Sequence, residues 1–359
     1  MLKYLTKRIL YGIIVLWGVI TIVFILFNIL PGDPARMMLG QRSDISTIET
    51  INKDLGRDKP MTTQYLNYIN DLSPFSIHNS KDKKSYWYLD GSKYTSYKQM
   101  FRFGDDMILI AKAPYLRRSY QSKRNVSAII DEAFPNTAIL ALTAITIALI
   151  IGIFIGMICA KHKDSLFDKA ALVLSVTGMS VPSFFAAIII AWLFAFVLAD
   201  YTGLNMFGSL YSVDALGRGE YIEMKNLILP ALTLGIRPLA IVIELTRSSL
   251  LEVYSQDFIR TARAKGLPEN KVIYRHALRN AMNPVITAIT GWFASLMAGA
   301  VFVEYVFDWK GIGVVIVDGL DKYDFPIVMG CVLFISVILI IINIFVDIVY
   351  AVLDPRVKL

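Results

Sequence analysis

The residues of this chain that could carry chemistry are a basic segment rich in small residues and a few charges inside apolar stretches. Residues 256–284 read QDFIRTARAKGLPENKVIYRHALRNAMNP and lie between two apolar segments. The sequence contains no GxxxxGK[ST], HExxH or GxSxG motif. The three histidines, His78, His162 and His276, lie outside the apolar runs. These absences argue against nucleotide hydrolysis and metal chemistry on this chain, and we expect it not to be an enzyme.

The basic segment predicts two short helices joined by a turn. Asp257 to Lys265 can form the first helix, and Gly266 suits the C′ position that ends it. Pro268 suits the first turn of the second helix, because its missing N–H would be unpaired there. We therefore expect an elbow at one membrane face that is offered to a soluble partner.

The elements around this segment are transmembrane helices. Hydrophobic residues make up 55% of the chain and the mean hydropathy is +0.54, which indicates a membrane protein. A transmembrane helix needs about 20 mostly apolar residues. Six runs meet this length: 9–30, 137–160, 170–199, 227–251, 284–303 and 326–346. The expected fold is an all-α polytopic membrane protein, and its first span is retained because it exceeds the length of a signal peptide.

Loop charges predict the orientation. With a cytoplasmic N-terminus, the inside segments hold 15 Lys and Arg against 6 Asp and Glu, and the two short outside loops hold 4 against 9. This is the positive-inside bias, so we expect both termini in the cytoplasm. The net charge of +7 follows from this topology and does not indicate nucleic acid binding. Cys159 and Cys331 lie in or beside spans and suggest neither a disulfide framework nor a metal site.

We expect three regions along the chain: residues 1–30, an extracytoplasmic loop at 31–136, and a core at 137–359 whose cytoplasmic loop is 251–283. Within the long loop, residues 46–55 and 61–69 have helical patterns. Residues 75–113 are rich in aromatics, and Asp90-Gly91 is a hairpin signal. We expect a small, partly β insertion there.

The charges inside the apolar runs have two interpretations. Arg237 lies deep in the fourth run and either lines a translocation path, where it can meet a peptide carboxylate, or pairs with Glu244 or another subunit; the second is slightly favoured. Arg247 is expected to snorkel, and Asp347 to be a structural partner. Pro182 should kink the third run beside Met179 and Ser180, which gives either a flexible point facing the pathway or a packing feature.

The segment from Thr261 to Gly266, followed by Arg275 to Asn280, resembles the coupling loop of ATP-binding-cassette importer permeases. Further motifs resemble the dipeptide/oligopeptide (peptide/nickel) branch of that family: Leu30-Pro31-Gly32-Asp33-Pro34, Pro135-Asn136-Thr137 at the start of the second span, Leu229-Pro230-Ala231-Leu232, Glu304, Trp309, Gly311-Ile312-Gly313 and Asp354-Pro355-Arg356. The resemblance covers residues 1–70 and 115–359, and residues 75–113 have no counterpart in it.

The resemblance implies a type I permease fold in a bacterial inner membrane and a function in peptide import. The implied partners are a second, similar permease, two ATPase subunits that carry ATP and Mg²⁺, and an extracytoplasmic substrate-binding protein; no cofactor is expected on this chain. Ala262 and Ala264 would allow close approach to the ATPase, and Arg260, Arg263 and Lys265 would meet its acidic rim. The residues expected to couple to the ATPase are Asp257, Phe258, Arg260, Thr261, Ala262, Arg263, Ala264, Lys265, Gly266 and Leu267. Glu304 would line or close the outer mouth, or else anchor the interface with Trp309.

Three alternatives remain open at this stage. The cargo could be nickel or another small solute carried by the same class of importer. An ion-coupled secondary transporter would be expected to show inverted repeats and midplane carboxylates, which the sequence does not show clearly. A membrane scaffold that uses its basic loop to recruit a soluble protein is the third alternative.

Overall fold

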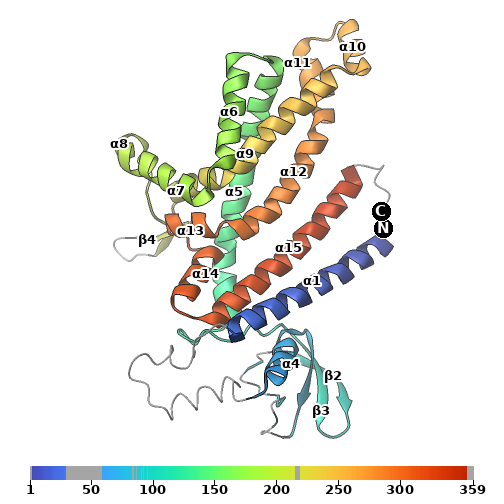
Figure 1. The fold of residues 1–359 in the computed structure, drawn as a ribbon, viewed down its shortest axis with the longest axis vertical. Helices are drawn as coiled ribbons and strands as arrows, with labels where there is room; N and C mark the ends of the chain where they lie inside the picture. Colours follow the sequence, from blue (N-terminus) through green and yellow to red (C-terminus); the bar gives the residue numbers. More distant parts are fainter. Residues whose placement is uncertain are drawn as a thin grey trace. The chain divides into compact units, whose positions relative to one another are not determined.

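The fold, seen in a computed structural model, is predominantly helical (Figure 1). The structure describes residues 2–29, 59–82, 85, 87–89, 91, 93–94, 96–214 and 219–353. The chain divides into two compact units, one of residues 1–12, 133–317 and 337–359 and the other of residues 13–132 and 318–336.

Four helices in the described ranges are each long and apolar enough to cross a membrane, and two bent pairs raise the number of possible spans to six. The four are α1 (Leu2–Ile29), α5 (Val126–Lys161), α9 (Lys225–Tyr254) and α15 (Phe325–Leu353). The first pair is α6 (Leu166–Ser180) and α7 (Ser183–Trp192) with its π-helical continuation η2 (Leu193–Val197). The second runs through α11 (Glu269–Lys271), η3 (Val272–Ala277) and α12 (Leu278–Gly299) into α13 (Val301–Phe307). The helical fold class predicted from the sequence is confirmed.

The second and third predicted spans differ from the structure in where the helix begins and in how strongly it is interrupted. Helix α5 begins at Val126, so Pro135 lies inside it instead of opening it. The expected kink at Pro182 is a complete break, and the two halves meet at 112°. Proline has no N–H and disfavours helical geometry in the residue before it, and Val181 is accordingly extended, at φ −73° and ψ 129°.

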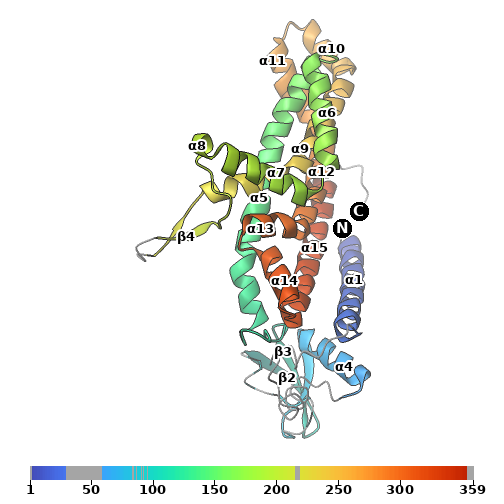
Figure 2. The same cartoon turned by 60° about the vertical axis from the view of Figure 1, so that its left-hand side comes forward.

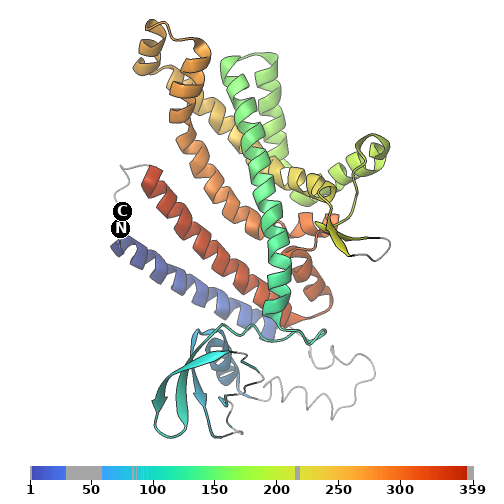
Figure 3. The same cartoon turned by 180° about the vertical axis from the view of Figure 1, so that it is seen from behind.

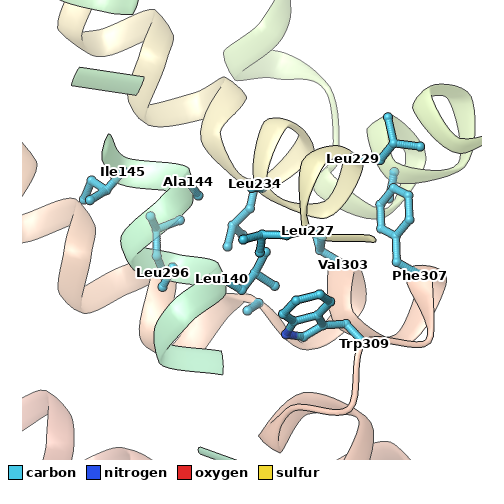
Figure 4. Packing of buried hydrophobic residues seen from close by; sticks show 14 of the residues in the cluster. Leu140, Ala144, Ile145, Leu227, Leu229, Leu234, Leu296, Val303, Phe307 and Trp309 are labelled. Atoms are coloured by element: carbon cyan, nitrogen blue, oxygen red, sulfur yellow. The ribbon is translucent and has the colours of Figure 1, made fainter. Parts of the chain in front are cut away.

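The core of the larger unit forms where α9 packs against α6, α7, α12 and α13. Figure 4 shows Leu140 and Ala144 of α5 facing Leu227 and Leu234 of α9, with Leu296, Val303 and Phe307 completing the cluster. Trp309 is fully buried in the same cluster. This packing holds the middle of α9 in place, which is where its charged residues lie.

Two ion pairs tie helix ends together within the larger unit. Arg247 of α9 does not snorkel as expected, because its Nε and Nη2 donate to both carboxylate oxygens of the buried Asp168 on α6, at 2.5 and 2.6 Å. A bidentate ion pair of this kind is stronger than one with a single hydrogen bond. Asp347 accepts from Nε of Arg8 at 2.9 Å, which agrees with its expected structural role.

The smaller unit contains α4 (Met61–Leu72), which matches the helix predicted at 61–69, and a three-stranded antiparallel sheet (Figure 3). The helix predicted at 46–55 lies outside the described residues. The strands are β1 (Phe75–Asn79), β2 (Tyr97–Phe103) and β3 (Met107–Lys112), in the order β1-β3-β2. The partly β insertion is therefore present.

The hairpin predicted at Asp90-Gly91 falls on Asp90, which lies outside the described residues. Among the described residues, a tight connection joins β2 to β3 through Gly104, whose φ is +63°. This connection was not predicted from the sequence. The larger unit also contains a short antiparallel ribbon of β4 (Tyr211–Val213) and β5 (Glu220–Ile222), which was not predicted.

The remaining short helices, α8 (Ala199–Thr202), α10 (Asp257–Ala264) and α14 (Ile312–Asp321), connect the longer ones. The polypeptide between α14 and α15 is held by Asp324, whose buried carboxylate accepts from the Ser119 hydroxyl and from the backbone N–H groups of Tyr120 and Gln121. This clamp fixes the start of α15 against the segment that leads into α5 within the smaller unit.

A buried polar cluster lies under the sheet. Asp71 accepts from Nζ of Lys93 at 2.8 Å and from the Tyr94 hydroxyl at 2.6 Å, and Nζ of Lys112 donates to the backbone oxygen of Asp71 at 2.5 Å. Burial lowers the pKa of Lys112 to about 8. The neighbouring His78 is buried, and desolvation, reinforced by the charge of Lys112, lowers its pKa to about 4.

The depressed pKa of His78 predicts a pH dependence of stability. Between its unfolded pKa of about 6.5 and its folded value of about 4, the unfolded state binds more protons, so stability falls as the pH falls through this window. We expect the amides of β1 and β3 to exchange faster at pH 5 than at pH 7, after correction for intrinsic rates.

The variant His78→Gln cannot be protonated and should lose this part of the pH dependence, whereas His162→Gln, at an exposed position, should retain it. An unchanged pH dependence in His78→Gln would contradict the assignment.

Candidate coupling and translocation sites

The elbow predicted from Gln256 to Pro284 is present, and α10 ends as expected. The amide of Gly266 donates to the Arg263 carbonyl at 2.9 Å and the amide of Leu267 to the Ala262 carbonyl at 3.4 Å. These two bonds form a Schellman motif with Gly266 in the left-handed region, at φ +74°. Pro268 is the N-cap of α11, immediately before the position expected for it.

One buried apolar cluster anchors the elbow. Ile259 and Ala262 on α10 pack with Leu250 and Val253 on α9 and with Ala277 of η3. Figure 2 shows α10 and α11 at the shared end of α9 and α12. Ala262 is buried and faces this cluster inside the chain, as expected of the apolar side of an amphipathic helix. Its predicted contact with a partner stays a prediction.

The outward face of α10 carries most of the other predicted coupling residues. Phe258 is 40% exposed, an unusual position for an aromatic ring. The predicted coupling residues that are exposed are Asp257, Phe258, Arg260, Thr261, Arg263, Ala264, Lys265 and Gly266, and Leu267 is half-buried. Arg263 is already engaged, because it forms an ion pair with Glu269 at 2.6 Å and lies over the ring of Tyr254.

The break between α6 and α7 brings four of the five predicted path residues to one region. Met179, Ser180 and Pro182 are exposed there, and the Ser180 hydroxyl donates to the Val176 carbonyl at 2.8 Å. Nη2 of Arg237 donates to the backbone oxygen of Val181 at 3.2 Å. Its Nε is buried and has no hydrogen-bond partner among the described residues.

The intrachain pairing of Arg237 with Glu244, which the sequence slightly favoured, is absent from the described structure, where Glu244 is exposed. Seven residues separate the two side chains by about 10 Å along the helix axis at 1.5 Å per residue, whereas the break at Pro182 brings the Val181 carbonyl within 3.2 Å of Nη2. A cavity of about 60 Å³ adjoins this contact and is lined by Gly178, Val181, Ser183, Ala186, Thr233, Leu234, Ile236, Arg237, Trp292, Ser295 and Leu296.

Glu304, the fifth predicted path residue, is fully buried in α13. Its Oε1 accepts from the Thr137 hydroxyl at 2.7 Å, and its Oε2 accepts from the Gly313 amide at 2.6 Å. The Thr137 hydroxyl also accepts from the amide of Ile312 at 2.9 Å. Glu304 thus joins α5 to the start of α14.

This junction brings together the motif Pro135-Asn136-Thr137 and the segment that contains Glu304, Trp309 and Gly311. Nδ2 of Asn136 donates to the Lys310 carbonyl at 2.8 Å, and Nε1 of Trp309 donates to the Asn136 carbonyl at 3.0 Å. A side chain at Gly311 would collide with the Glu304 carboxylate. Their spacing of more than 170 residues gave no indication that these motifs meet.

Among the described residues, no cluster of three or more His, Cys, Asp or Glu side chains is arranged to hold a metal ion. The apolar helices, the broken helix beside Arg237 and the polar elbow fixed to two long helices define a multi-span helical membrane protein.

Comparisons with known proteins place the chain in a family. Residues 152–359 match the family "Binding-protein-dependent transport system inner membrane component", and residues 1–83 match the N-terminal family of the same components. The chain belongs to the binding-protein-dependent transport system inner membrane components, in its peptide permease branch.

Individual relatives agree with this assignment. The dipeptide transport system permease protein DppB of Alkalihalophilus pseudofirmus is 31% identical, with 100% of each chain covered. The glutathione transport system permease protein GsiC of Salmonella choleraesuis is 34% identical over 100% of this chain and 99% of the relative. A solved structure of the inward-facing MetNI methionine ABC transporter is similar in fold, with a TM-score of 0.50 and 12% identity over 63% of this chain and 97% of that chain.

The Glu304 junction predicts a loss of stability when its carboxylate is removed. Glu304→Ala would leave the Thr137 hydroxyl and the Gly313 amide buried without their acceptor. We expect destabilisation of about 2–4 kcal/mol, measured as a lower unfolding temperature of the purified protein in detergent.

Gly311→Ala should produce a similar loss, because its new methyl group would displace the Glu304 carboxylate. Glu220→Ala, which removes an exposed carboxylate from β5, is the matched control and should be neutral. Equal unfolding temperatures for Glu304→Ala and Glu220→Ala would contradict the bracing role.

Proposed function

We propose that this chain is a permease subunit of an ATP-driven importer that moves peptides into the cytoplasm of a bacterium. Membership of the family and relatives that transport dipeptides and glutathione support this cargo class. The chain would span the inner membrane with both termini in the cytoplasm, in keeping with the distribution of loop charges. Nickel or another small solute is the alternative cargo.

The observation that carries the proposal is the anchoring of the elbow. A single cluster connects α10 to the ends of α9 and α12, so a force applied to α10 would reach both helices. The exposed face with Phe258, Arg260 and Lys265 would dock on the ATPase, and Arg263 would stiffen the elbow through Glu269. Asp257, Thr261, Ala264, Gly266 and Leu267 would shape the docking surface, with Ala262 supporting it from beneath.

The proposed assembly contains this chain, a second homologous permease, two ATPase subunits that bind ATP and Mg²⁺, and an extracytoplasmic substrate-binding protein. Closure of the ATPase dimer would move the elbow and rock the helices from inward-open to outward-open. Met179, Ser180, Pro182 and Arg237 would then line the path that the cargo follows. Glu304 would brace the outer end of that path.

Reconstitution into vesicles tests the function directly. We expect the assembly to accumulate a labelled dipeptide only when ATP is supplied on the ATPase side and the binding protein on the other side. Accumulation driven by a proton gradient without ATP would instead identify a secondary transporter. Recruitment of a soluble protein without any transport would identify a scaffold.

A substitution at Gly266 tests the coupling elbow. A β-branched residue in the left-handed region costs roughly 1–2 kcal/mol, so Gly266→Val should distort the Schellman motif. We expect peptide uptake to fall at least fivefold while basal ATP hydrolysis by the assembly continues.

Gly266→Asn is the matched control, because asparagine tolerates this conformation and no atom stands within 4 Å of the added Cβ. It should retain most uptake. If Gly266→Val supports wild-type uptake and stimulated hydrolysis, α10 is not the coupling element.

A further inference from the structure

Arg237 is a half-buried cation, and most of its hydrogen-bonding capacity is unused within the described part of the chain. A guanidinium has five N–H donors in a planar fork. One nitrogen, Nη2, contacts the Val181 carbonyl at 3.2 Å, and the buried Nε has no partner in the described part of the chain. No carboxylate of the described residues forms an ion pair with it, in contrast to Arg247 on the same helix, which holds Asp168. A charge near the middle of an apolar helix ordinarily faces a partner or a wet cavity.

The cavity beside Arg237 has the chemistry of an anion site. Ser183 and Ser295 contribute hydroxyls, Trp292 forms part of the wall, and no acidic side chain lines it. Ser183 also begins α7, and no side chain caps the amides of that first turn. A helix N-terminus adds partial positive charge to the guanidinium that already lies there.

The size of the cavity limits what it can take. Its volume of about 60 Å³ has room for a carboxylate group and a few water molecules but not for a whole peptide. A planar guanidinium matches a carboxylate through two parallel hydrogen bonds, which a spherical anion cannot accept.

We propose that the cavity at the α6–α7 break is a subsite for one carboxylate of the cargo, bound by Arg237 with help from the hydroxyls of Ser183 and Ser295. This rests on the peptide-import function proposed above. The free C-terminal carboxylate of a peptide and an acidic side chain share this chemistry. Because the contact lies where α6 and α7 diverge, cargo and the Val181 carbonyl share the same guanidinium.

The experiment uses the complete assembly in vesicles and compares wild type with Arg237→Gln. The probes are a neutral dipeptide, its C-terminal amide, and the amide of a dipeptide with one acidic side chain. We expect Arg237→Gln to raise the KM for the neutral dipeptide about tenfold or more and to leave that of its amide unchanged. For each probe, the KM of the variant is divided by the KM of the wild type, so the preference of the separate binding protein cancels.

The acidic amide distinguishes the two sources of the carboxylate. If Arg237→Gln impairs transport of the acidic amide, a side-chain carboxylate also enters the subsite. If transport of the acidic amide is unchanged, the subsite accepts only the C-terminal carboxylate. Arg237→Lys keeps the charge but not the fork and should be intermediate. Arg102→Gln, on the exposed strand β2, is the matched control for loss of one arginine.

Two results would overturn the proposal. Equal effects on the dipeptide and its amide would mean that Arg237 only supports the helix break. If neither the wild-type nor the Arg237→Gln assembly transports the amides, the KM for the neutral dipeptide is compared instead. An unchanged KM together with a lower unfolding temperature of the variant would mean that Arg237 has a structural role alone. Absence of any ATP-driven peptide uptake by the wild type would instead refute the importer function, so the two failures are distinguishable.

Discussion

The contact between Arg237 and the carbonyl of Val181 is the constraint on which the central region depends. A bilayer offers no water to unpaired backbone groups, so irregular backbone at membrane depth persists only where protein or a wet cavity satisfies it. The break at Pro182 leaves carbonyls at the end of α6 without following helical amides. Arg237 donates to one of them and also faces the cavity, which makes a 112° change of direction compatible with a membrane environment.

The position of that arginine depends in turn on the packing of α9. Leu234 lies one turn before Arg237 in the main apolar cluster, and Arg247 is fixed to Asp168 on α6 further along the same helix. The helix therefore cannot rotate about its axis without breaking a buried ion pair and a close-packed core. The elbow at the end of α9 is where a partner could apply a force, and α9 and α6 would then move together because the ion pair joins them.

How much the sequence predicts depends on whether the determining interactions are local. The ends of α10 follow from Gly266 and its neighbours, because a Schellman motif involves only adjacent residues, and here prediction and structure agree. Hydropathy likewise predicts spans of about 20 residues. Arg247 was misjudged because its partner, Asp168, is 79 positions away, and a lone cation at a helix end looks the same whether it snorkels or is paired.

The same reasoning applies to Ala262 and to the strand connection at Gly104. The spacing of apolar residues along α10 shows that one face is apolar, but not whether this chain or another protein covers it, and the covering residues come from α9 and η3. The β2–β3 connection at Gly104 was not predicted, because strand partners are determined by the sheet as a whole. In both cases, long-range packing decides between two locally equivalent solutions.

The larger unit therefore contains two buried polar sites that differ in how fully their hydrogen bonds are satisfied. The Glu304 carboxylate is saturated, since each of its oxygens has a donor, and Gly311 leaves no room for a side chain. The Arg237 site is unsaturated, because Nε has no partner among the described residues and the residue lines a cavity. Saturated buried networks resist rearrangement because each broken bond leaves an unpaired polar group, whereas an unsaturated site gains interactions when a ligand arrives. A transporter needs both, since only a site that is incomplete at rest can distinguish the presence of cargo from its absence.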